Sequence, residues 1–127
     1  MNTAADTYIS NALEDYLKAI YLLSRKKPAV RITDIALQLG ISKPSVNRAV
    51  NTLKAQGLVL HEPYGDILLT PEGERLGGSF FYKHKMIKRF LTQVLGVPEE
   101  QADSEADSIG HTISPDTVNK MAMYMNE

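Results

Sequence analysis

The sequence predicts a mainly α-helical protein in two parts. The first part holds helices and one short two-stranded hairpin, and the second holds helices alone. Apolar residues repeat at helical spacing along most of the chain. Two short β-prone runs, Leu58 to His61 and Asp66 to Leu69, interrupt that pattern, with a turn between them. Residues 1–71 carry eight Lys and Arg against six Asp and Glu, whereas residues 72–127 carry six against nine. We therefore expect one domain at 1–71 and a second, more acidic one at 72–127.

The composition excludes several classes of protein. The 127 residues include no cysteine, which excludes disulfide frameworks, zinc fingers and thiolate metal sites. No apolar run approaches the roughly 20 residues that a membrane span needs. Asp6 and Glu14 lie where an export signal would be basic. We expect a soluble, cytoplasmic protein with no membrane partner.

The first expected helix covers residues 11–25, because Leu13, Leu17 and Ile20 recur at spacings of four and three. Residues 32–50 then predict two helices joined by a tight turn. Ala36 is the small residue where such helices cross, and Gly40 permits the positive φ of the turn. Apolar contacts that fix the angle are expected from Ile35, Leu39, Ile41, Val46 and Val50.

The second helix of this pair is predicted to expose a polar face. Ser42 suits its N-cap and Pro44 its first turn. Hydroxyl and cationic side chains suit DNA phosphates, and Asn and Arg suit base edges. An ordinary helical hairpin with a solvated face is the alternative, but the two strands that follow complete a winged helix-turn-helix and favour double-stranded DNA as the partner. The candidate DNA-binding residues are Arg31, Ser42, Lys43, Pro44, Ser45, Asn47 and Arg48.

The second part is predicted to hold three helices. Thr70 caps a long helix that runs to about Leu95 and ends at Gly96, and further helices open at Pro98 and at Pro115. Three helices are too few to bury all their apolar faces, so a homodimer is expected. The faces concerned are Leu76, Phe80, Ile87, Phe90, Leu91 and Val94 in the long helix and Val118, Met121, Ala122 and Met125 in the last.

Carboxylate and imidazole side chains raise the question of a metal site. Asp107 and His111 are four residues apart, so one helix face carries both. His84 lies on the long helix and Asp15 on the first. Such a set without sulfur suits Mn(II) or Fe(II). From the spacing alone, solvated helix neighbours are the commoner interpretation.

A series of segments carries a family resemblance over nearly the whole chain: Leu13-Glu-Asp-Tyr-Leu-Lys-Ala-Ile-Tyr, Arg31-Ile-Thr-Asp-Ile-Ala, Ser42-Lys-Pro-Ser-Val, Leu68-Leu-Thr-Pro-Glu-Gly, Tyr82-Lys-His, Phe90-Leu, Leu95-Gly-Val and Ile109-Gly-His-Thr-Ile-Ser. In this order they resemble the diphtheria-toxin-repressor family of metal-dependent regulators, within it the manganese branch. The resemblance implies a dimeric repressor on a palindromic operator that controls metal homeostasis genes. It also implies Mn(II) or Fe(II) bound by Asp15, His84, Asp107 and His111. The resemblance also implies a member without the SH3-like third domain of the iron-sensing members.

Three positions depart from the family pattern. Lys18 and Gly110 stand where the manganese branch has carboxylates, and Lys88 stands where an ancillary site of the iron branch has a glutamate. An ammonium group repels a nearby metal ion. The departures therefore weaken a binuclear site and leave room for a single ion with four protein ligands.

The expected switch is a shift of population. Without metal, a hinge around Thr70 to Glu74 would let the winged helices sample many spacings, and bound metal would select one that fits two operator half-sites. In one alternative, Lys18 replaces the metal by pairing with Asp15 or Asp107, so that DNA binding is metal-independent. A winged helix used for protein contacts is a further alternative. The most remote is a hydrolase using His84, Asp107 and His111, which no nucleophile motif supports.

Overall fold

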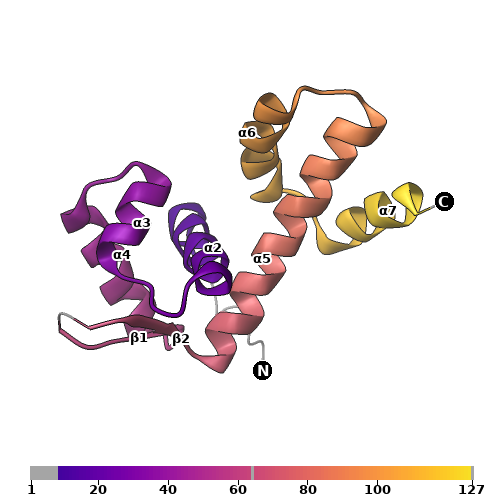
Figure 1. Cartoon of the computed structure of the whole chain (residues 1–127). Helices are drawn as coiled ribbons and strands as arrows, with labels where there is room; N and C mark the ends of the chain where they lie inside the picture. The colour runs from indigo at the N-terminus through magenta and orange to yellow at the C-terminus, as the bar shows by residue number, and fades with distance from the viewer. Residues whose placement is uncertain (1–8, 64, 127) are drawn as a thin grey trace. The chain divides into compact units, whose positions relative to one another are not determined.

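A computed structural model describes residues 9–63 and 65–126, and the chain divides into two compact units, Met1–Gly78 and Ser79–Glu127. Figure 1 shows the element order. The boundary falls within α5 (Pro71–Arg89), beyond the predicted boundary at residue 71. Each unit is described by itself below.

The first unit contains the predicted helices. These are α2 (Asn11–Lys26), α3 (Ile32–Leu39) and α4 (Lys43–Ala55). Ser10 caps α2, its hydroxyl oxygen accepting from the Leu13 amide at 3.2 Å. Gly40 ends α3 at φ 66°, a left-handed conformation that glycine adopts without steric cost. The predicted helix-turn-helix is therefore present.

The wing is an antiparallel hairpin of β1 (Val59–His61) and β2 (Ile67–Leu69). Its inner side chains, Val59 and Ile67, are buried. The Ile67 amide donates to the Val30 carbonyl at 2.8 Å, which joins the wing to the segment before α3. Helices α2, α3 and α4 and the wing thus share one core, whose largest fully buried side chains are Leu17, Ile20, Ile35, Val46, Val50, Leu53, Val59 and Ile67.

The start of α5 is held to the first unit. The Thr70 hydroxyl donates to the Gly57 carbonyl at 2.7 Å and accepts from the Gly73 amide at 3.0 Å. Glu74 pairs with Arg25 of α2. These contacts join Thr70 to Glu74 to the first unit, and the hinge around these residues stays a prediction.

The second unit contains the rest of α5, the π-helical turn η1 (Phe90–Val94), α6 (Glu99–Gly110) and α7 (Pro115–Met125). The predicted long helix thus changes to a π turn before it ends at Gly96, whose φ is 73°. Val94, predicted to be buried, is exposed, because a π turn inserts one residue and rotates those after it. The core of this unit consists of Met86, Ile87, Leu91, Ala102, Ala106 and Val118.

None of the helices that the structure describes is long and apolar enough to span a bilayer.

Both α6 and α7 contact η1, so the π turn is part of the surface against which these two helices pack.

Replacing Gly73 with Ala tests how closely α5 approaches the wing. The added Cβ would lie 2.0 Å from the Leu58 carbonyl oxygen, so the backbone must shift. We expect the free energy of unfolding, measured in urea, to fall by about 1–3 kcal/mol, the usual cost of overpacking. Ser79→Ala, on an exposed position of the same helix, is the control. Equal stability of the two variants would contradict this close approach.

Candidate functional site

The recognition helix α4 separates an apolar face from a polar one. Val46, Val50 and Leu53 are fully buried. Of the predicted DNA-binding residues in this helix, Lys43, Pro44, Asn47 and Arg48 are exposed and Ser45 is half-buried. The apolar face therefore fixes which side chains the helix can present to a ligand.

Side-chain hydrogen bonds order the beginning of this polar face. The Ser42 hydroxyl accepts from the Ser45 amide at 3.3 Å and donates to the Ser45 hydroxyl oxygen at 3.0 Å. Arg48 donates to the same Ser45 oxygen at 3.2 Å. The N-cap and the first two turns thus form one connected polar surface. The structure brings together the predicted residues from Ser42 to Arg48.

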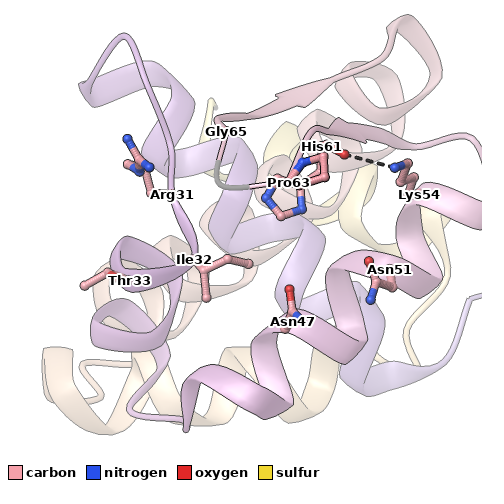
Figure 2. Close-up of a pocket in the computed structure, with 9 residues that line it drawn as sticks. All are labelled: Arg31, Ile32, Thr33, Asn47, Asn51, Lys54, His61, Pro63 and Gly65. Carbon is pink, nitrogen blue, oxygen red and sulfur yellow. Dashed lines mark hydrogen bonds between the residues drawn. The ribbon is translucent and has the colours of Figure 1, made fainter.

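A groove of about 530 Å³ lies between α4, the start of α3 and the wing. Figure 2 shows Asn47 and Asn51 on α4, with His61 and Pro63 of the wing across from them. Arg31 and Thr33 line the third side. A concave surface with cationic and amide side chains beside a recognition helix can accept a nucleic-acid strand.

Two further residues of this groove, Asn51 and Lys54, were not predicted from the sequence. Lys54 donates to the His61 carbonyl oxygen at 2.9 Å. Lys54 therefore ties the recognition helix to the wing. Asn51 follows Asn47 by four residues, so helical spacing would have placed both on one face. The prediction stopped at the first two turns of the helix.

Arg31 is held at the edge of the groove by its neighbours. Its backbone amide donates to the Asp34 carboxylate at 2.8 Å, and its guanidinium lies 3.9 Å from Asp66 of the wing segment. Lys27 donates to the other Asp34 oxygen at 2.7 Å. The Lys27 hydrogen bond, followed by that of the Arg31 amide, lowers the pKa of Asp34 below its usual range.

The predicted metal ligands fall in both units. Asp15 lies on α2 in the first unit, where its carboxylate is 3.6 Å from the Lys18 ammonium nitrogen. His84, Asp107 and His111 lie in the second unit. His111 is the C-cap of α6 at φ −77° and ψ −14°, so helical geometry continues from Asp107 to this residue.

His84 is the centre of a charged cluster in the second unit. Its side chain is only 16% exposed, and its two ring nitrogens face two carboxylates. Nε2 hydrogen-bonds with Asp103 Oδ1 at 2.9 Å, and Nδ1 lies 2.9 Å from Asp107 Oδ1. The structure thus joins the predicted residues His84 and Asp107. Asp103 is a third member of the cluster, because its carboxylate contacts His84. Glu105, an acidic residue nearby in the same helix, accepts a hydrogen bond from Gln101.

Lys88 supplies a second cation beside the cluster. Its ammonium nitrogen is 3.3 Å from Glu99 and 3.5 Å from Asp103. The hydrogen bond from His84, together with the charge of Lys88, lowers the pKa of Asp103. Burial lowers the pKa of Lys88, but its contacts with Glu99 and Asp103 outweigh that effect, so the pKa is raised. The lowered pKa of Asp103 favours its ionised form beside His84 and Lys88.

The donor types of the cluster fit a divalent metal ion, because imidazole nitrogen and carboxylate oxygen suit Mn(II) and Fe(II). In the part of the chain that the structure describes, no group of three or more His, Asp or Glu side chains is arranged as a ready-made metal site. Around His84 the nitrogens and oxygens contact each other directly. Metal binding would replace a nitrogen–oxygen contact of His84 with two metal–ligand bonds.

Comparison with known proteins supports this description of both units. Residues 9–67 match the N-terminal DNA-binding domain of the iron-dependent repressor, and residues 70–127 match its metal-binding and dimerisation domain. A relative from Lysinibacillus sphaericus, an HTH-type transcriptional regulator MntR, is 33% identical over 111 residues, which are 87% of this chain and 79% of the relative. The MntR of Bacillus pumilus is 31% identical over 110 residues, 87% of this chain and 76% of that protein.

Solved structures give the same result. The manganese regulator SloR has 33% identity and a TM-score of 0.79, covering 90% of this chain and 53% of that one. The IdeR of T. acidophilum has 29% identity and a TM-score of 0.79, with 90% and 54% covered. This chain therefore spans about half the length of these solved structures.

A winged-helix unit joined to a metal-binding, dimerising unit defines the class of metal-dependent, DNA-binding transcriptional regulators. The chain belongs to the iron-dependent repressor family. Membership confirms the predicted mainly α fold with its two-stranded wing, the resemblance and a DNA-binding homodimer. The relatives are transcriptional regulators, which argues against the hydrolase alternative.

The lowered pKa of Asp34 predicts a pH-dependent contribution to stability. A carboxyl group with a depressed folded-state pKa stabilises the fold above its unfolded value of about 4, and this contribution is lost as the pH falls through the folded value. We expect Asp34→Asn to lower the free energy of unfolding at pH 7 by about 0.5–1 kcal/mol, the range of a partly exposed pair. The difference from the wild type should shrink towards pH 3.

Urea denaturation at both pH values measures this difference, and Glu62→Gln, an exposed charge loss in the wing segment, is the control. A destabilisation by Asp34→Asn that is the same at both pH values would show that the carboxylate charge has no part in holding Arg31.

Proposed function

We propose that this protein is a metal-responsive transcriptional repressor that acts in the cytoplasm and binds a palindromic operator as a homodimer. The observation that carries the proposal is the exposed polar face of α4 beside the wing groove, in a chain whose two halves match the two domains of one repressor family. Genes for metal homeostasis are the proposed targets, since the relatives include a manganese regulator.

The DNA interface consists of the predicted residues around α4. Lys43 and Arg31 contact phosphates, and Asn47 and Arg48 contact base edges in the major groove. Ser42, Pro44 and Ser45 form the helix start that approaches the DNA backbone. The orientation of this face is supported by the buried Val46 and Val50 on the other side of the helix.

The proposed metal ligands are His84, Asp107 and His111 of the second unit and Asp15 of the first. When bound, a Mn(II) or Fe(II) ion supplies positive charge that holds these donors together. His84 and Asp107 are already adjacent, and His111 is one helical turn beyond Asp107. The resulting restriction of motion would favour one spacing of the two recognition helices in the dimer.

The dimer surface is proposed to include apolar side chains of the second unit. The side chains of Leu95, Met123 and Tyr124 are each more than 60% exposed, and all three lie in the region that matches a dimerisation domain. A second copy of the chain would cover them.

The alternative in which Lys18 makes DNA binding metal-independent is not favoured, because the family is metal-dependent. Lys18 does pair with Asp15 within α2. Metal analysis of the purified protein distinguishes the two mechanisms, since a bound stoichiometric transition metal excludes the metal-independent one.

Variants of two residues of α4 separate base contacts from phosphate contacts. Operator duplexes are first selected from a random library with metal present. Asn47→Ala should weaken binding by about 1–3 kcal/mol and relax selectivity at one base pair per half-site. Lys43→Ala should weaken binding to all sequences and reduce the salt dependence, lowering the slope of log K against log salt by about 1. Unchanged affinity and unchanged base preference in Asn47→Ala would remove this helix from the interface.

His111→Ala tests the metal response. The wild type should bind the selected duplex more tightly with Mn(II) than with chelator, and the variant should lose that gain because one imidazole ligand is absent. Fluorescence anisotropy of a labelled duplex measures both. Thr112→Ala, an exposed neighbour, is the control and should keep the gain. Equal wild-type affinity with metal and with chelator would count against metal control.

A further inference from the structure

A row of polar side chains along α6 contacts two basic side chains of α5, one at each part of the row. Glu99, Asp103, Asp107 and His111 follow one another at four-residue intervals in and at the end of this helix. Residues at this interval lie on one helical face. Two residues of α5, His84 and Lys88, contact the carboxylates of this row.

Lys88 neutralises the N-terminal half of the row. Its ammonium nitrogen lies 3.3 Å from Glu99 and 3.5 Å from Asp103 Oδ1. The same Asp103 oxygen is 2.9 Å from His84 Nε2. A metal ion bound between Nε2 and this oxygen would lie within a few ångströms of the ammonium group, which repels it. The side of His84 that faces Asp103 is therefore unsuitable for metal.

The opposite side of His84 has the complementary character. Nδ1 is 2.9 Å from Asp107 Oδ1, and His111 follows one turn later. A neutral imidazole has one N–H and one lone pair. With the N–H at Nε2 donated to Asp103, Nδ1 and the Asp107 oxygen lie 2.9 Å apart and can share one cation, either a proton on Nδ1 or a bound metal ion.

We infer that Asp103 is a positioning residue for the metal site. It accepts a hydrogen bond from Nε2–H of His84, is held in place by Lys88, and so leaves Nδ1 as the metal-binding atom on the side of Asp107 and His111. Asp103 itself does not contact the ion. Ligand histidines commonly donate their second N–H to such a carboxylate, which fixes both the tautomer and the ring orientation. This inference rests on the metal site proposed above.

Asp103→Ala is the variant that tests this role, and Glu105→Ala is its matched control. Both truncate an exposed carboxylate of α6, but Glu105 contacts Gln101 and not His84. Mn(II) binding is followed by the EPR signal of the free ion, and Co(II) binding by its visible absorption bands. We expect Asp103→Ala to raise the Mn(II) dissociation constant about 10- to 100-fold. The number of ions bound and the positions of the Co(II) bands should stay as in the wild type.

Four outcomes separate the roles. Affinities of Asp103→Ala and Glu105→Ala that agree would overturn the positioning role. Co(II) bands that change in Asp103→Ala as they do in Asp107→Ala would show that Asp103 is itself a ligand, which also overturns it. Wild-type protein that binds neither Mn(II) nor Co(II) would remove the proposed metal site, and this inference with it. Retained stoichiometry and bands with weakened affinity support the inference.

A measurement on the metal-free protein is independent of these titrations. Long-range ¹H–¹⁵N spectra distinguish the two tautomers of a neutral imidazole. We expect Nε2 of His84 to carry a proton in the wild type and in Glu105→Ala, and this preference to be lost in Asp103→Ala. A wild-type ring with no proton on Nε2 would contradict the assignment.

Discussion

Burial of the apolar face of α4 is the constraint on which the DNA-binding unit depends. Val46, Val50 and Leu53 are fully buried in the core shared with α2, α3 and the wing. A helix buried on one side has only its other side for recognition. The polar residues from Lys43 to Arg48 are exposed for this reason. Packing energy, rather than any attraction between the side chains and DNA, sets the orientation of the recognition surface.

The wing adds to that surface because it is joined to α4 in two ways, by a shared core and by a hydrogen bond. Its inner residues share the core, and Lys54 donates from the helix to the His61 carbonyl. The start of α5 is joined to the same unit through Thr70, Gly73 and Glu74. The first turn of α5 therefore belongs to the DNA-binding unit.

Charge balance governs the second unit. The α6 row places carboxylates one helical turn apart, and cations beside it offset their mutual repulsion. Lys88 is a cation supplied by the chain, and a bound metal ion is the proposed second one. A permanent ammonium group and an exchangeable ion differ in one respect that matters for regulation. The occupancy of the site by the ion depends on the ion's concentration, whereas the ammonium group is always present.

The sequence by itself determined the elements and their order. Leu13, Leu17 and Ile20 predicted α2 by their spacing, Gly40 predicted the turn of the helix-turn-helix, and Thr70 predicted the start of α5. These features depend on the local backbone preferences and on helical periodicity, which neighbouring residues carry. The exposed half of the DNA interface followed from the same periodicity, so Lys43, Asn47 and Arg48 could be named in advance.

Only the tertiary structure decided which distant residues meet. Asp103 and His84 are separated by 19 positions in the chain, and no local pattern indicated that Nε2 would contact this carboxylate instead of Glu105. The sequence likewise did not predict the π turn at Phe90–Val94 or the contacts that join residues 70–74 to the rest of the first unit. The physical reason is the same in each case: these features are set by how whole elements pack, and periodicity within one element contains no information about its neighbours.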